Sequence, residues 1–245
     1  MKELSNKILF GNLVTTMIGR EKEIAIIIRL MTEKKNVVIF GKQGVGKTSI
    51  IQEVINNAGR GGILYSPQSR TLKETLINLL SSGHQRDKKM NKMNTLALKK
   101  NCYEVLNQNP GYIILDHLEG VEPKHYSFLN YIIDKNIPLM VVSRSLKKEA
   151  IGHLRMSLFS FEKVEICNLD RQAADMLTDS FIKEIGIETA KKDDFKKEIF
   201  KISEGNPRVI KQLCILAHDG KYNRNGCLDA HLMDLDRRIS EVIAK

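Results

Sequence analysis

The residues with the most definite chemistry lie between positions 41 and 48, where the chain reads Gly-Lys-Gln-Gly-Val-Gly-Lys-Thr. In this GxxxxGK[ST] pattern, glycines let backbone N–H groups surround an anion, and the following helix adds unpaired N–H groups and its dipole. Lys47 can reach the outer phosphates of a nucleoside triphosphate, and the Thr48 hydroxyl can bind Mg²⁺. We expect nucleotide contacts from Gly41, Gln43, Gly44, Val45, Gly46, Lys47, Thr48 and Ser49.

A second polar group is expected beside this loop, at the end of the apolar run Tyr112–Leu115. Asp116 follows that run directly, so its carboxylate is suited to hold the same magnesium ion through water. The next carboxylate along the chain is Glu119, because position 117 is a histidine. Two possibilities stay open: Glu119 activates the attacking water, or hydrolysis is slow and the bound nucleotide acts mainly as a switch.

Short apolar runs indicate the frame that positions these groups. Five runs rich in β-branched residues predict strands: Val37–Phe40, Ile63–Tyr65, Tyr112–Leu115, Leu139–Val142 and Val164–Ile166. Each of the first four precedes a polar or glycine-containing turn and a stretch of helical periodicity, such as Thr48–Asn57. Buried strands that alternate with helices predict an α/β fold, a three-layer αβα P-loop NTPase core with a parallel sheet.

The pattern changes near Leu169, beyond which we find no strand candidate. Asp170 is a suitable N-cap for the first helix of this part, and glycines are suited to end the helices. The expected helices are Asp170–Ile185, Asp193–Ser203, Asn206–His218 and Leu228–Ala244. The predicted domains are therefore an α/β core at residues 1–168 and a small all-helical lid at residues 169–245.

Further segments resemble motifs of AAA+ and STAND-type P-loop ATPases, in the order those proteins have them, from about residue 16 to residue 218. Ile18-Gly19-Arg20, followed by Glu21, resembles the GRE box, a segment that packs against the adenine in those proteins. Ser143 stands at the end of the fourth predicted strand, where the family has a polar sensor 1 residue near the γ-phosphate.

The GNPR sequence at positions 205–208 is similar to the sensor 2 motif of the origin-recognition branch and of ATPases that assist transposition or act in secretion. The resemblance implies that Pro207 and Arg208 reach the nucleotide from the lid. It also implies that an arginine of one subunit completes its neighbour's site, and Arg155 stands where the family often has this residue, with Arg144 as the alternative. The implied catalytic residues are Lys47, Asp116, Glu119, Ser143, Arg155 and Arg208.

The composition of the chain indicates which partners, which location and which kinds of metal or disulfide site to expect. The 245 residues include 39 Lys and Arg against 29 Asp and Glu, a formal charge of +10 that favours a polyanionic partner. The basic segment 86–100 offers Lys88, Lys89 and Lys92 as candidate contacts to DNA. No apolar run approaches the roughly 20 residues of a membrane span, and the four cysteines form no CxxC pair. We therefore expect a cytoplasmic protein with no membrane contact, no disulfide framework and no transition-metal site.

The leading hypothesis is an ATPase that binds ATP or ADP with Mg²⁺, assembles as an ATP-dependent homo-oligomer on duplex DNA and recruits a protein partner, as transposition helpers and replication loaders do. The alternative is a STAND-type signalling switch with slow hydrolysis and no role on DNA. A metabolic P-loop kinase is less favoured, because we find no motif for an acceptor substrate. We expect core and lid only, without the winged-helix module of the origin-recognition branch.

Overall fold

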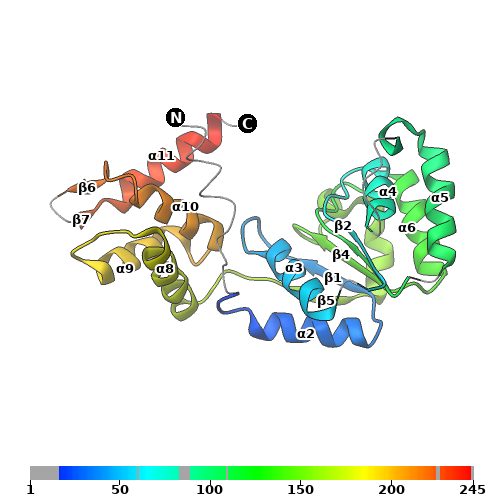
Figure 1. The fold of residues 1–245 in the computed structure, drawn as a ribbon, viewed down its shortest axis with the longest axis horizontal. Coiled ribbons are helices and arrows are strands. Elements are labelled where there is room, and N and C mark those ends of the chain that lie inside the picture. Colours follow the sequence, from blue (N-terminus) through cyan, green and yellow to red (C-terminus); the bar gives the residue numbers. More distant parts are fainter. Residues whose placement is uncertain (1–16, 60, 83–88, 109, 225–226, 244–245) are drawn as a thin grey trace.

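The computed structural model of the chain describes residues 17–59, 61–82, 89–108, 110–224 and 227–243. Figure 1 shows the elements in two groups: a sheet with its covering helices on the right, and the C-terminal helices on the left. The chain between the last strand of the sheet and the first C-terminal helix runs from one group to the other.

The sheet consists of five parallel strands, which confirms the predicted fold class. They are β1 (Val37–Phe40), β2 (Ile63–Ser66), β3 (Tyr112–Leu115), β4 (Leu139–Ser143) and β5 (Glu162–Glu165). Their spatial order is β2-β3-β4-β1-β5, and the first four strands in the chain begin at the expected residues.

The predicted fifth strand is present, but its bounds differ: it runs from Glu162 to Glu165 and not from Val164 to Ile166. It lies at the edge of the sheet and pairs only with β1. Val164 is its one buried residue, and its charged neighbours are exposed. Outward-facing charges are a common protection of sheet edges against pairing with other chains. An edge strand with this pattern lacks the continuous apolar run by which the buried strands are recognised.

The sheet is covered by helices on both faces, which makes the core three layers thick. Successive residues of a strand point to opposite faces: Val38 and Val141 pack in one cluster with α4, α5 and α6, whereas Ile39 and Val142 pack in another with α2 and α3. The helices are α2 (Glu21–Thr32), α3 (Lys47–Ala58), α4 (Leu72–Ser81), α5 (Thr95–Asn107) and α6 (Pro123–Asp134). The short elements are η1 (Met90–Lys92), α7 (Lys148–Ile151) and η2 (Gly152–Ser160).

The C-terminal helices have a hydrophobic cluster of their own, to which Phe181, Leu213 and Met233 belong. They are α8 (Arg171–Ile185), α9 (Lys192–Ser203), α10 (Pro207–Ala217) and α11 (Ala230–Ile243). Asp170 caps α8 as predicted, since its Oδ1 accepts a hydrogen bond from Ala173 N at 2.8 Å. In the described ranges no helix is both long and apolar enough to cross a membrane.

The prediction of an all-helical C-terminal part is wrong in one place. Asn223–Arg224 (β6) and Cys227–Leu228 (β7) form a short antiparallel pair, so the last helix begins at Ala230 and not at Leu228. The sequence does carry the signal for this pair, because Asn225-Gly226 is a preferred two-residue hairpin turn. The sequence analysis considered the glycines of this part only as residues that end helices.

The strand order decides which loops meet. Strand β4 lies between β1 and β3, so Ser143 at its end stands between the start of the glycine-rich loop at Gly41 and the carboxylate of Asp116. All three residues come at the carboxyl ends of parallel strands, the edge of an open α/β sheet at which ligands bind.

Candidate functional site

A cavity of about 440 Å³ lies at this carboxyl edge, between the glycine-rich loop and the C-terminal helices. Its volume is within the range of small-molecule sites, roughly 300–1,000 Å³. One part of its wall is polar and carries the loop, Asp116 and several basic side chains. The other part is apolar and is formed by Met17, Ile18, Leu169, Leu177 and Phe181. The cavity therefore offers a place for a charged group next to a place for a flat apolar one.

The glycine-rich loop has the backbone conformation that an anion cradle requires, and it is open at Gly46. Gly44 and Gly46 have φ values of +85° and +96°, a region that glycine adopts most easily. A Cβ atom on Gly46 would meet no heavy atom within 4 Å, so the backbone there is open to a ligand. Helix α3 begins directly after Gly46, with no side-chain cap and no acidic residue in its first turn. Its N-terminal N–H groups are thus suited to an anionic ligand.

Lys47 folds back over the loop. Its Nζ donates hydrogen bonds to the carbonyl oxygens of Gly41 at 2.7 Å and Lys42 at 2.9 Å. Burial lowers the pKa of Lys47 from its ordinary value; the charge of Asp116 opposes this effect, and the charge of Arg144 adds to it. An anion in the cavity would stabilise the charged ammonium, because opposite charges nearby favour the ionised form.

Thr48 and Asp116 meet at the floor of the site. The Thr48 hydroxyl donates to Asp116 Oδ2 at 2.7 Å, and it lies 3.3 Å from His117 Nε2. His117 has a left-handed φ of +53°, and its N–H donates to Asp116 Oδ1 at 2.7 Å. Asp116 is only 1% exposed, so these bonds hold a buried carboxylate beside the Thr48 hydroxyl.

This donor set fits magnesium bound together with a nucleotide. Among the described residues no group of three or more His, Cys, Asp or Glu side chains could hold a metal ion by itself. Mg²⁺ does not need such a cage, because it binds through one or two protein oxygens, water and phosphate oxygens. Thr48 and Asp116 supply oxygens of the required kind at one point.

Glu119 is paired with Arg144. The Nε of Arg144 lies 2.7 Å from Glu119 Oε1, the side chains are 52% and 29% exposed, and both residues line the cavity. Sequence reasoning named Glu119 as a water-activating carboxylate and Arg144 as an alternative trans arginine, but it did not foresee the pair. The two residues come from the loops after β3 and β4, which only the strand order makes neighbours.

The start of α10 is hydrogen-bonded to the glycine-rich loop. Asn206 Nδ2 donates to Gln43 O at 3.0 Å, while its Oδ1 accepts from the N–H groups of Arg208 at 3.1 Å and Val209 at 3.4 Å. The Arg208 N–H also lies 3.2 Å from Gly44 O. These bonds place the exposed side chain of Arg208 at the cavity, opposite the loop.

Arg20 connects three segments at the edge of the cavity. Its Nη2 donates to Val45 O at 3.0 Å and to Cys167 O at 2.7 Å, and its Nη1 pairs with Glu23 at 2.8 Å. The side chain is thus buried between the glycine-rich loop, α2 and the chain that enters the C-terminal helices. The resemblance implied a contact of this segment with the adenine. In the structure Met17 and Ile18 form part of the apolar wall, and Arg20 connects the three segments by its hydrogen bonds.

Most of the expected site residues are brought together. Those that line the cavity are Ile18, Arg20, Gln43, Gly44, Val45, Gly46, Lys47, Thr48, Ser49, Asp116, Glu119, Ser143, Pro207 and Arg208. Three expected site residues do not line it: Gly19, Gly41 and Arg155. Gly41 and Arg155 line a separate hollow.

Sequence reasoning missed three residues at or beside the polar part of the cavity. Arg70 and Lys211 line the cavity, and burial together with the nearby charge of Asp116 raises the pKa of Tyr65 to about 12. Arg70 could have been found, because it follows a parallel strand at its carboxyl end. Lys211 lies three residues after Arg208 on α10, so the helical spacing that puts both on one face was a usable signal.

No family model matches the chain, and a search of curated proteins finds no match either. What the cavity does must therefore be inferred from its own geometry.

Asn206→Ala is expected to lower the free energy of unfolding by about 1–2 kcal/mol, because it removes the cap of α10 together with the bond to Gln43. It should also weaken nucleotide binding, because the start of α10 is released from the loop. The control is Asn94→Ala, which removes a cap of α5 that bonds to Ala97 N at 2.8 Å. Urea unfolding and nucleotide titration of both variants test this; equal nucleotide affinity in the two variants would contradict it.

Proposed function

We propose that the protein binds ATP with Mg²⁺ in this cavity and hydrolyses it, as an AAA+-type ATPase that assembles with further copies on duplex DNA and recruits a protein partner. The proposal depends on the hydrogen bond of 2.7 Å between Thr48 and Asp116, which lies beside a glycine-rich loop that is open at Gly46 and faces Arg208. A cofactor-free structural role would not require a basic cavity with this arrangement.

The polar and the apolar part of the cavity wall suit different parts of a nucleotide. The loop N–H groups, Lys47 and Arg208 are suited to the phosphates, and the apolar wall that includes Ile18 and Phe181 is suited to the base. Mg²⁺, held by Thr48 with Asp116 beside it, would neutralise phosphate charge. The preference for adenine follows from the resemblance to AAA+ proteins.

Hydrolysis requires a base and positive charge near the γ-phosphate. The oxygen of a water molecule attacks the γ-phosphorus, the bond to the β–γ bridging oxygen breaks, and Glu119 accepts the proton of the water. Lys47 and Arg208 stabilise the charge that develops on the phosphoryl oxygens. Arg155 lies outside the cavity of its own chain, at a second hollow, so a contribution to ATP hydrolysis would have to be made at the site of another copy.

A nucleotide-controlled switch is the second candidate, and the pairing of Glu119 with Arg144 favours it. A carboxylate oxygen that is engaged by an arginine is less accessible to a water molecule, which would make turnover slow. The switch predicts tightly held nucleotide, little hydrolysis and no response to DNA. An ATPase assay with and without duplex DNA, combined with sizing of the protein in ATP and in ADP, distinguishes the two candidates.

Glu119→Gln is expected to reduce turnover about 100-fold while ATP affinity is kept, because the amide cannot accept the proton. The matched control is Glu122→Gln, which changes an exposed carboxylate three residues away and should leave turnover unchanged. Steady-state phosphate release and ATP titration measure the two quantities. Unchanged turnover in Glu119→Gln would remove this residue from the mechanism and favour the switch.

A further inference from the structure

A second hollow, of about 680 Å³, adjoins the glycine-rich loop at the ends of β1, β4 and β5. Its lining carries more positive than negative side chains, and we call it the basic hollow. The basic residues are Lys42, Arg144, Lys147, Lys148 and Arg155, and the acidic ones are Glu149 and Glu165. All of these side chains are exposed. A concave surface with this charge suits a polyanion.

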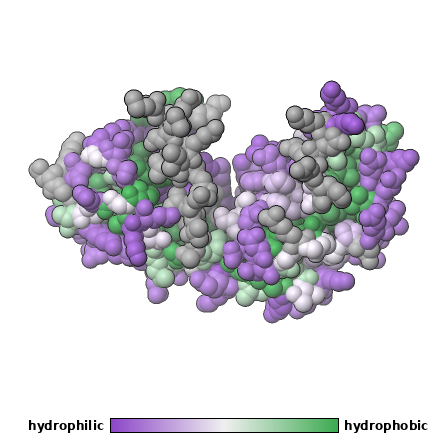
Figure 2. All heavy atoms as spheres, in the orientation of Figure 1, coloured by the Kyte–Doolittle hydropathy of each residue, from purple (hydrophilic) through white to green (hydrophobic). Residues whose placement is uncertain are grey.

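The shape and chemistry of the basic hollow favour nucleic acid over other polyanions. A flat lipid surface would not enter a concavity, and a lining of lysine and arginine suits phosphate contacts, which need charge and no sequence-specific geometry. The formal charge of +10 on the whole chain attracts the same kind of partner. Figure 2 shows hydrophilic side chains over much of the visible surface.

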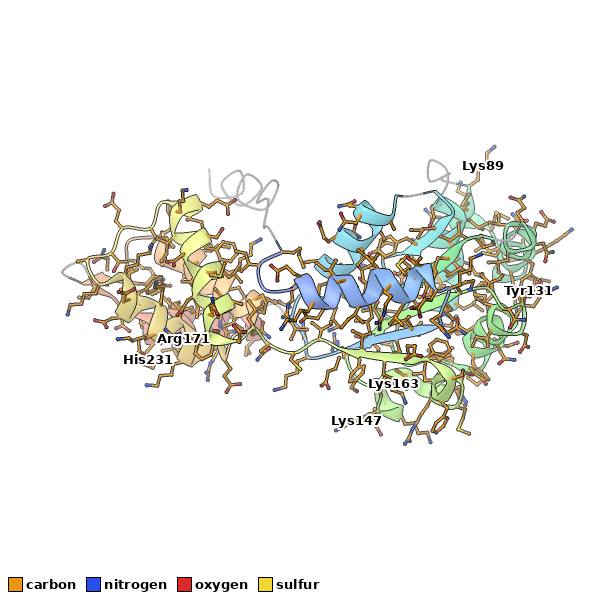
Figure 3. The ribbon with its side chains drawn as sticks, turned by 90° about the horizontal axis from the view of Figure 1, so that it is seen from below. Lys89, Tyr131, Lys147, Lys163, Arg171 and His231 are labelled. Carbon is orange, nitrogen blue, oxygen red and sulfur yellow. The ribbon has the colours of Figure 1, made fainter. Side chains whose placement is uncertain are left out.

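The lysines singled out from the sequence lie elsewhere. Lys88 falls outside the described residues, and Lys89 and Lys92 belong to the segment around η1. Figure 3 shows Lys89 at the upper right and Lys147 at the bottom of the group that contains the sheet, well apart from each other. Neither Lys89 nor Lys92 lines the nucleotide cavity or the basic hollow. A ligand bound there would have no direct connection to the phosphates of a nucleotide.

Arg144 is the side chain that connects the two sites, because it lines both the nucleotide cavity and the basic hollow. It pairs with Glu119 at 2.7 Å, but both side chains are partly exposed, and ion pairs in water contribute little. A phosphate group offers the guanidinium two parallel hydrogen bonds and more charge, so it competes well with a single carboxylate.

We propose that the basic hollow binds the phosphate backbone of duplex DNA, and that Arg144 then leaves Glu119 for a DNA phosphate. Glu119 becomes free to accept the proton of the attacking water, so DNA binding accelerates ATP hydrolysis. This inference rests on the proposed ATPase function. It goes beyond that function because it names the surface that binds DNA and the two residues, Arg144 and Glu119, through which DNA binding accelerates ATP hydrolysis.

The DNA contact is tested with the double variant Lys147→Gln/Lys148→Gln. Each lysine that contacts a phosphate adds about one to the slope of log affinity against log salt, so the slope should fall by about two. The control is Lys163→Gln on β5, whose exposed lysine lies near Lys147 in Figure 3 but does not line the hollow. Fluorescence anisotropy of labelled duplex DNA, with ATP present and salt varied, measures the slope. An unchanged slope in the double variant overturns the assignment.

The coupling is tested with Arg144→Ala. The decisive quantity is the ratio of ATP turnover with duplex DNA to turnover without it, which should fall to about one because Glu119 is already free. A ratio equal to that of the wild type overturns the role of Arg144. Thermal unfolding of each variant, followed by circular dichroism, shows that it has folded.

These experiments distinguish a failure of the proposed ATPase function from a failure of the proposed DNA site. If the wild-type protein neither binds nor hydrolyses ATP, the proposed function fails. If it hydrolyses ATP, and the double variant retains DNA with the wild-type salt dependence, the function stands and the DNA site is wrong. Retention on phosphatidylserine vesicles without retention on duplex DNA would also overturn the site, in favour of a membrane surface.

Discussion

Lys47→Ala is expected to weaken ATP binding about 100-fold, because it removes the ammonium group nearest to the glycine-rich loop. The loop backbone would remain, so some affinity for phosphate is kept. Without nucleotide, Lys47 is a partly buried charge whose pKa is lowered by burial, and its loss should therefore change the stability of the free protein little.

The expected difference in ATP affinity between the wild type and Lys47→Ala can be measured as a difference in melting temperature. A ligand that binds only the folded state stabilises it by about 2.7 kcal/mol at a concentration 100 times its Kd, so ATP should raise the melting temperature of the wild type. The same ATP concentration should raise that of Lys47→Ala much less. Lys22→Ala, an exposed lysine of α2, is the control and should respond as the wild type does. An equal rise in all three proteins would show that ATP does not bind at this loop.

Gly205→Ala is expected to reduce the free energy of unfolding by about 3 kcal/mol or more. Gly205 has a φ of +78°, where a side chain costs about 1 kcal/mol, and an added Cβ would lie 2.0 Å from the carbonyl oxygen of Leu169. That carbonyl belongs to the backbone, and Leu169 N donates to Gly205 O at 2.9 Å, so neither segment can move freely.

Gly220→Ala is the matched control for this prediction. Gly220 has a similar φ of +67°, but an added Cβ would meet nothing within 4 Å, so we expect a loss of only about 1 kcal/mol. Guanidinium unfolding of both variants measures the difference. Equal losses would mean that the close approach at Leu169 relaxes easily. Because Gly205 precedes Asn206 and Arg208, Gly205→Ala should also weaken nucleotide binding.

The fold class and much of the site could be predicted because their signals are local. The glycine-rich loop is recognised from eight consecutive positions, and its context, a buried strand followed by a helix, is adjacent to it. The caps at Asp170 and Asn206 are likewise contacts between near neighbours. Strands β1 to β4 begin with continuous apolar runs, which makes their starts predictable, whereas the run Val164–Ile166 marks only part of the exposed edge strand β5, and the short pair β6–β7 was not predicted.

The sequence by itself determined which residues could bind phosphate and magnesium, and that they sit at the ends of parallel strands. The tertiary structure decided which of them meet: Thr48 reaches Asp116 across 68 positions, Arg20 reaches Cys167 across 147, and Asn206 reaches Gln43 across 163. The physical reason is that a strand or helix forms from nearby residues, but the insertion of β4 between β1 and β3 depends on how all the helices cover the sheet. That order, which no local pattern encodes, is what places Arg144 against Glu119.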